Sequence, residues 1–258
     1  MHQTEIGKTA PETIQSKLKP LEGGGFTFAC HPGVPCFTEC CRDLNLLLTP
    51  YDILRLKNRL ALKSGDFLDR HTELKFAESS SLPMMYLQMN ANERKTCPFV
   101  SEQGCLVYED RPSACRIYPL ARASRMHRLH GTIRENYFVL HEDHCRGFEQ
   151  NQSWTMAEWL QDQGLVPYYE SNDLWMQIIT HPVLRNGALA PKQVQMFYLA
   201  SYDLDKFRDF VFGSRFLSMF AVPENRLEKI EGEDTGLLEL AFDWMKFSFL
   251  REQSLRQK

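Results

Sequence analysis

The sequence contains no uninterrupted apolar stretch of the length that a secretory signal or a membrane span requires. Residues 1–25 carry Lys and Glu throughout, and the most apolar stretch, residues 242–250, is interrupted by Asp243, Lys246 and Ser248. A bilayer span needs roughly 20 apolar residues, and a signal needs a continuous apolar core. We therefore expect a soluble cytoplasmic protein with no membrane partner.

Several motifs of known chemistry are also missing. There is no glycine-rich turn between a strand and a helix, because Gly23 to Gly25 precede an expected strand. The C-terminal half has no Ser/His/Asp arrangement and no paired-carboxylate motif, so no catalytic residue is assigned. The formal net charge of −3 gives no reason to expect a nucleic-acid partner.

Cysteine is absent after residue 145 but abundant before it. Four of the eight cysteines fall within twelve residues, in the stretch FTFACHPGVPCFTECCR. Thiolates are soft ligands that select zinc, copper(I) or iron–sulfur centres. The candidate metal ligands are all eight: Cys30, Cys36, Cys40, Cys41, Cys97, Cys105, Cys115 and Cys145.

Two other interpretations of the cysteines compete with metal binding. An even number of cysteines predicts a disulfide framework in a short secreted chain, but in a reducing compartment it indicates metal or catalysis. Scattered thiols buried in a core are the other alternative. Eight cysteines with one adjacent pair, Cys40 and Cys41, favour metal binding over both.

The choice between zinc and an iron–sulfur cluster is nearly open, because both accept four thiolates. In an extended backbone, Cys40 and Cys41 would face opposite ways, so either one is not a direct ligand or they serve different metals. Eight thiolates allow two four-cysteine sites, or one site with the remaining cysteines structural. The ligand type favours a [4Fe–4S] cluster over zinc.

The predicted fold class is α+β and mostly helical. We expect a flexible leader over residues 1–25, a small cysteine-rich metal-binding module over residues 26–150, and a helical C-terminal region over residues 151–258 packed against it. A chain of 258 residues with 43% apolar side chains can bury such a core.

Capping signals place the first helices. Thr49, Pro50 and Asp52 have the order of an N-cap, a first helical residue and a capping-box carboxylate. Ser64 begins a second helix, so residues 49–76 are expected to form a helical hairpin. Residues 84–108 favour a small β-hairpin with a loop.

The C-terminal region is read as a series of helices. Ser153 is expected to cap the first, and the second is expected to end before Pro182. Pro191 opens a third, with a break near Ser201, and the last begins at Gly236. The dense aromatic residues of this region indicate a core rather than a ligand groove.

The cysteine series, followed by LTPYD, CPF and GCLVYEDRPSACRIYP, resembles the YkgJ-type cysteine-cluster family. The resemblance covers roughly residues 26–150 and includes Cys145 in the segment HCRGF. It implies a domain that chelates zinc or iron, with the eight cysteines as its ligands. It determines neither the metal nor a reaction.

The cluster also has a distant likeness to that of flagellin lysine methylases, in which an iron–sulfur centre works with S-adenosylmethionine. That likeness implies an enzyme. The sequence departs from the usual radical spacing, because Cys36 and Cys40 fit its first interval but Asp43 stands where the third cysteine is needed.

Histidines and arginines near the cysteines are secondary candidates. His31, His141 and His144 lie beside Cys30 and Cys145 and are of a type that can ligate metal. Six arginines without an acidic residue among them indicate either an anion site or a solvated basic face: Arg111, Arg116, Arg122, Arg125, Arg128 and Arg134.

The sequence therefore predicts a metal-binding protein with an iron–sulfur cluster or zinc. Three functional classes remain open, and whether the protein is an enzyme is undecided. They are a redox or protein-modifying enzyme, including a methyltransferase-like one; a metal-binding or electron-transfer protein; and a zinc-stapled structural or interaction protein.

Overall fold

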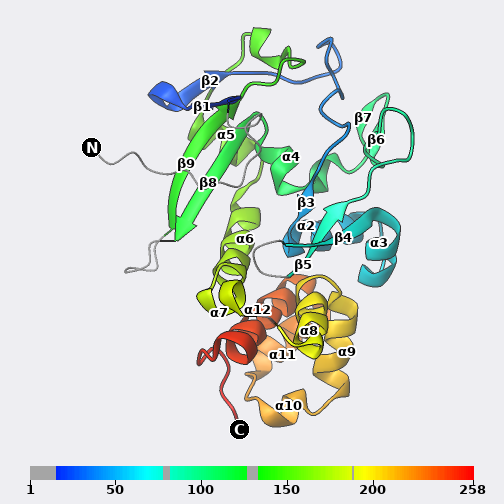
Figure 1. Ribbon diagram of the computed structural model, residues 1–258, viewed down its shortest axis with the longest axis vertical. Coiled ribbons are helices and arrows are strands. Elements are labelled where there is room, and N and C mark those ends of the chain that lie inside the picture. Colours follow the sequence, from blue (N-terminus) through cyan, green and yellow to red (C-terminus); the bar gives the residue numbers. More distant parts are fainter. Residues whose placement is uncertain (1–15, 78–81, 127–132, 188) are drawn as a thin grey trace. The chain divides into compact units, whose positions relative to one another are not determined.

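The computed structural model describes residues 16–77, 82–126, 133–187 and 189–258 (Figure 1). These residues form eleven α-helices and ten short strands, which confirms the predicted α+β, mostly helical class. The chain divides into two compact units. The first contains residues 1–40 and 114–165, and the second contains residues 41–113 and 166–258.

The first unit is built on a three-stranded antiparallel sheet and a short two-stranded ribbon. In the sheet, β9 (Ile133–Leu140) lies between β1 (Leu18–Pro20) and β8 (Leu120–Met126). Figure 1 shows β8 and β9 as two long neighbouring arrows. The ribbon pairs β2 (Gly25–Thr27) with β10 (Ser153–Thr155), and α5 (Met156–Asp162) follows it.

The cap predicted for the first C-terminal helix is wrong. Ser153 lies in β10, opposite Thr27, and the helix α5 begins three residues later, at Met156. Thr155 is the N-cap, because its hydroxyl accepts from the Glu158 N–H while the Glu158 carboxylate accepts from the Thr155 N–H. Pairing between strands about 130 residues apart in sequence therefore determines the conformation of Ser153, and its local capping preference does not.

The second unit combines most of the helices with a small sheet. In the sheet, β5 (Pro83–Leu87) lies between β3 (Leu47–Leu48) and β4 (Thr72–Phe76), and β6 (Val100–Ser101) pairs separately with β7 (Gly104–Cys105). The helices are α2 (Pro50–Arg59), α3 (Ser64–His71), α6 (Val166–Ile179), α7 (Pro182–Asn186), α8 (Pro191–Ser201), α9 (Leu204–Gly213), α10 (Phe216–Met219), α11 (Glu224–Gly232) and α12 (Asp234–Leu250). A short helix, α4 (Ser113–Ile117), spans the boundary between the units.

The predicted start of α2 is confirmed. Thr49 caps the helix, Pro50 is its first residue, and Asp52 accepts a hydrogen bond from the Thr49 N–H at 2.9 Å. The helical hairpin predicted over residues 49–76 is wrong in its last part, because residues 72–76 form β4. These five residues pair with all of β5, so the sheet satisfies backbone groups that a longer α3 would have satisfied internally.

The C-terminal helices follow the sequence signals closely. The second one, α6, ends at Ile179, before Pro182, and the third breaks after Ser201 into α8 and α9. Most of the apolar face of α12 is buried, with Phe242 only 2% exposed, which confirms the core interpretation of its aromatic residues.

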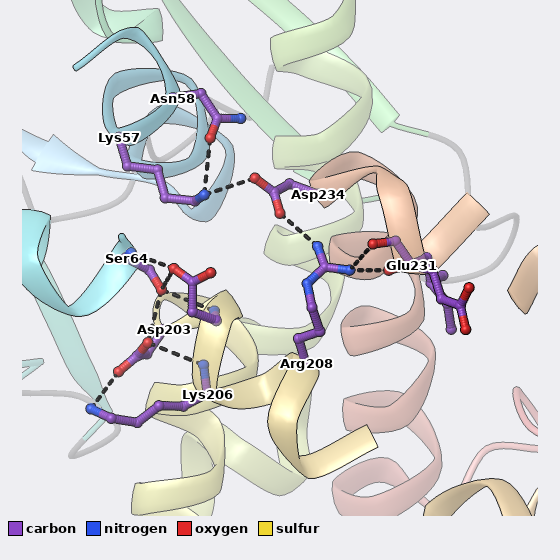
Figure 2. Close-up of polar contacts among 10 residues, drawn as sticks. Lys57, Asn58, Ser64, Asp203, Lys206, Arg208, Glu231 and Asp234 are labelled. Carbon is purple, nitrogen blue, oxygen red and sulfur yellow. Dashed lines mark hydrogen bonds and ion pairs between the residues drawn. The ribbon is translucent and has the colours of Figure 1, made fainter. Parts of the chain in front are cut away.

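A buried charge network joins distant segments within the second unit (Figure 2). Lys57 of α2 is 5% exposed, and its Nζ lies 2.7 Å from a carboxylate oxygen of Asp234 in α12. Arg208 of α9 holds the other oxygen of Asp234 at 2.8 Å. A second group links Ser64 of α3 to α9, because the Ser64 Oγ donates to Asp203 at 2.8 Å. The network therefore ties α2 and α3 to α9 and α12.

The predicted division into a leader, a cysteine module and a C-terminal region stays a prediction. Residues 1–15 of the expected leader lie outside the described residues, and β1 lies in its remainder. None of the helices in the described part of the chain combines the length and the apolar character that a bilayer span needs.

Candidate metal centre

The eight cysteines carry thiols rather than disulfides and are divided between the two units. Cys30 is exposed, and the other seven are half-buried. The boundary between the units falls between the adjacent residues Cys40 and Cys41. The first unit contains Cys30, Cys36, Cys40, Cys115 and Cys145, and the second contains Cys41, Cys97 and Cys105.

Backbone pairing anchors the start of the first cysteine loop to the segment after Cys145. The Phe28 N–H donates to the Gln152 carbonyl at 2.8 Å, and the Ala29 N–H donates to the Gly147 carbonyl at 3.1 Å. The indole N–H of Trp154 donates to the Phe28 carbonyl at 2.9 Å. These bonds extend the β2–β10 ribbon, so two segments more than 110 residues apart enter the site together.

Gly147 allows this close approach. A Cβ atom at this position would lie 2.9 Å from the Ala29 carbonyl oxygen and would overlap the ring of Phe28. Phe28 is 2% exposed and packs edge-on against Tyr118, Phe148 and Trp159. The aromatic cluster thus fixes the position of the chain on both sides of the cysteines.

Three thiols of the first unit share one neighbourhood. Burial raises the pKa of the Cys145 thiol, and Cys36 and Cys40 are close enough to raise it further by repulsion between thiolates. A hydrogen bond from the Gly147 N–H opposes this increase. The Arg146 N–H donates to the Cys36 Sγ at 3.0 Å. Two successive backbone amides therefore point at two different sulfur atoms.

Cys115 lies on α4, which is anchored within the first unit by its following residues. The Trp159 indole N–H donates to the Ile117 carbonyl at 3.0 Å, and the buried Arg116 donates to the Gln163 carbonyl at 2.6 Å. At the other end of α4, within the second unit, the fully buried Asp52 accepts from the Ser113 N–H at 2.8 Å. Burial raises the pKa of the Asp52 carboxyl despite these hydrogen bonds.

The three cysteines of the second unit are connected through their backbones. The Cys97 N–H donates to the Cys41 carbonyl at 2.8 Å, and Cys105 pairs with Val100 in the β6–β7 hairpin. The Phe99 N–H points at the Cys97 Sγ, 3.5 Å away. This unit therefore also has a backbone amide directed at sulfur.

The donor chemistry of both sets suits a thiophilic metal. Clustered thiolates are the usual ligands of zinc and of iron–sulfur clusters, and N–H groups directed at sulfur are the interactions that tune such centres. Over the described ranges, no three side chains of His, Cys, Asp or Glu are close enough together to hold a metal ion.

The three candidate histidines each have a contact of another kind. The Nδ1 of His31 accepts from the Gly33 N–H at 3.2 Å, and His141 stacks on Phe148 with ring centroids 4.2 Å apart. His144 lies 3.7 Å from a carboxylate oxygen of Glu142. Their assignment as ligands stays a prediction.

Three of the arginines between residues 111 and 134 have protein partners. Arg111 stacks on Tyr108, Arg116 donates to Gln163, and Arg122 forms an ion pair with Glu135 at 2.5 Å. Arg128 lies outside the described residues, and only the backbone of Arg125 is described. These contacts favour a structural role over an anion site.

Comparison with known families agrees with the positions of the cysteines. Residues 29–150 match the CxxCxxCC family, described as a "Putative zinc- or iron-chelating domain". The match supports metal binding, contains all eight cysteines and leaves the C-terminal helices outside the family segment. No curated protein and no solved structure shows significant similarity to the chain.

The groups around the sulfur atoms were not identified from the sequence of this CxxCxxCC domain. Cys145 is followed by Arg146 and Gly147, whose backbone amides approach sulfur, and the glycine was a usable signal. Nothing in the sequence marks Tyr118, three residues after Cys115, as a neighbour of the site. A side-chain pattern does not report which backbone N–H groups face a thiol.

Proposed function

We propose that the CxxCxxCC domain binds metal through its cysteine thiolates, with an iron–sulfur cluster favoured over zinc. The proposed ligands of the first unit are Cys30, Cys36, Cys40, Cys115 and Cys145, and those of the second are Cys41, Cys97 and Cys105. A bound cluster would supply reversible one-electron transfer, whereas zinc would supply a cross-link. If the bound group is an iron–sulfur cluster, the proposal includes redox or protein-modifying chemistry. If it is zinc, the proposal does not include it.

The observation that carries this proposal is that Cys36 and Cys40 lie near Cys145. These cysteines come from positions up to 109 residues apart, Cys36 and Cys40 act electrostatically on Cys145, and the Cys36 Sγ accepts from the Arg146 N–H at 3.0 Å. Coordination replaces the thiol protons by a cation, which offsets the repulsion between the resulting thiolates and couples metal binding to folding.

The division of Cys40 and Cys41 supports two thiol sets rather than one. Each unit has its own cysteines and its own backbone amide at sulfur, which are Arg146 N for the first set and Phe99 N for the second. We therefore propose that the adjacent cysteines serve different metal centres. Under this proposal, substitutions in one set leave the other set loaded.

Metal analysis of anaerobically purified protein tests the proposal. Iron with sulfide and broad visible absorption would identify a cluster, whereas zinc without colour would indicate the structural alternative. The single substitution Cys36→Ser should remove the metal bound by the first thiol set. Cys97→Ser should remove the metal bound by the second. Full metal content and unchanged stability in both variants would overturn the proposal.

The second candidate function is a zinc-stapled interaction protein. It is favoured by the capped, well-packed helices of the second unit, which resemble a scaffold more than a catalytic site. Enzymatic use of the metal requires an open coordination position. Binding of a small exogenous ligand to the loaded metal, seen as a spectral change, would favour an enzyme, including the methyltransferase-like alternative.

A further inference from the structure

Tyr118 lies against the aromatic cluster that orders the first cysteine set. It follows Cys115 by three residues, and its ring packs edge-on to Phe28 with centroids 5.9 Å apart. The ring of Phe28 in turn occupies the space that a side chain at Gly147 would need. The ring of Tyr118 is therefore held beside the turn that contains Cys145.

The hydroxyl of Tyr118 has an unusual environment. Its oxygen is buried and has no hydrogen-bond partner at ordinary distance among the described residues. Its neighbours are Cys145 and Glu142. A phenol has an ordinary pKa of about 10, so it keeps its proton at neutral pH and is a donor. A buried donor without an acceptor is unfavourable, so packing of the ring does not by itself account for the hydroxyl.

The nearby sulfur is the acceptor that this donor lacks. Cys145 is half-buried, and Cys36 and Cys40 lie near it. The Tyr118 hydroxyl and the Gly147 N–H are both directed toward Cys145. A metal-bound thiolate is a stronger acceptor than a thiol and would satisfy the phenol.

We propose that Tyr118 is a positioning residue whose phenol donates a hydrogen bond to the sulfur of Cys145 when that sulfur binds metal. The inference rests on the proposed metal-binding function and extends it to a non-cysteine residue. Outer partners of metal ligands orient them and tune the centre, and donors to sulfur change the potential of iron–sulfur clusters.

The substitution Tyr118→Phe removes the hydroxyl and keeps the ring that packs on Phe28. We expect metal affinity to fall about 10-fold or more, which is typical for loss of an outer partner. We also expect the sulfur-to-metal charge-transfer bands to shift. If the metal is a cluster, its midpoint potential should become more negative, because a donor that lowers the charge on sulfur is lost.

Tyr137→Phe is the matched control. Tyr137 lies in the same unit, but its hydroxyl donates to the Glu135 carboxylate at 2.8 Å, on β9. It should leave affinity and spectrum unchanged. The thermal stability of both variants without metal separates a general loss of folding from an effect on the centre.

The outcomes distinguish this inference from the proposed function. A wild-type chain that binds no metal would overturn both. A wild-type chain that binds metal, together with a Tyr118→Phe variant of equal affinity, spectrum and potential, would overturn only the role of Tyr118. If Tyr118→Phe does not fold, fluorotyrosine can be placed at position 118 instead. Its fluorine resonance is expected to shift when metal is added. An unchanged resonance would refute the hydrogen bond.

Discussion

In the first unit, backbone amides point at the sulfur atoms of Cys36 and Cys145, whereas in the second unit ionised side chains join the helices. Arg146 N and Gly147 N approach sulfur in the first unit. In the second, Lys57, Asp203 and Asp234 join helices through charge-assisted bonds. The proposed sulfur site needs a metal to be complete, whereas the ion network pairs side chains of the protein with one another.

The comparison shows what each unit needs for stability. Under the proposed function, the first unit gains stability from metal, since coordination energy contributes to folding. The second unit depends on its C-terminal helices, because α2 and α3, from the family segment, are tied by the charge network to α9 and α12. Removing the helices α6 to α12 should therefore damage the second unit directly, whereas removing metal should affect the first unit as well.

The largest effect is expected from a chain that ends at Gln150. It lacks α6 to α12, which bury Tyr51 and Lys57, and it lacks Trp154 and Trp159 of the aromatic cluster. We expect complete loss of cooperative unfolding, since a domain has only about 5–15 kcal/mol of stability to lose. Circular dichroism during heating measures this. A soluble, metal-loaded product with unchanged thermal stability would show that the helices are dispensable.

The next effect is the removal of a buried charge. Asp234→Ala leaves Lys57 buried without its carboxylate, which should lower the free energy of unfolding by about 3–5 kcal/mol. The control Glu239→Ala breaks an exposed pair with Lys229 and should cost about 0–1 kcal/mol. Urea unfolding of both variants checks the difference. Equal costs would show that the network stabilises the second unit no more than a surface pair does.

A smaller effect, in the first unit, is expected from Gly147→Ala. The added methyl group meets the ring of Phe28 and the Ala29 carbonyl, so we expect a loss of about 1–3 kcal/mol and a lower metal content. Gly213→Ala is the control, because no atom lies within 4 Å of its added methyl group. The measurement is metal content per chain, which should fall for Gly147→Ala in the first unit and stay unchanged for Gly213→Ala in the second. Unchanged metal in Gly147→Ala would remove the link between the close approach and the site.

Acid should weaken the second unit modestly. Burial opposes ionisation of Asp205 and Asp234. Hydrogen bonds from Ser64 nevertheless hold the pKa of Asp205 below its ordinary 3.8. The hydrogen bond and the charge of Lys57 do the same for the pKa of Asp234. Because the folded pKa is the lower one, the stabilisation is complete above about pH 4 and is lost as pH falls through the folded value.

The raised pKa of Asp52 acts with the opposite sign, since its stabilisation is present at low pH and is lost as pH rises. The double variant Asp205→Asn/Asp234→Asn should therefore lose the acid-induced decrease that the wild type shows in urea unfolding. An unchanged decrease would assign acid sensitivity to other carboxylates.

The smallest effect is expected from replacing Arg122, Arg125 and Arg128 together with alanine. Arg122 pairs with Glu135 on the neighbouring strand, so we expect a change in stability of about 0–1 kcal/mol and full metal content. Metal analysis is the measurement. Loss of metal would show that these arginines support the metal site. Unchanged metal content with loss of an activity of the protein would favour the anion-site interpretation.

Signals that act over a few residues were read correctly from the sequence. The capping box of Thr49 and Asp52, the end of α6 before Pro182 and the break after Ser201 all depend on neighbouring residues, and each is confirmed. The same holds for the family segment, because cysteine spacing is a property of the sequence itself. Local hydrogen bonding and backbone preferences account for these features without reference to distant contacts.

Only the tertiary structure decided which distant residues come together. Ser153 carries a cap signal, but pairing with Thr27 places it in a strand, and residues 72–76 form β4 because β5 lies beside them. Likewise, the sequence does not show that Cys36 shares a neighbourhood with Cys145, or that Cys40 and Cys41 belong to different units. Such pairings depend on the burial and hydrogen bonding of the whole chain, and a local pattern does not contain them.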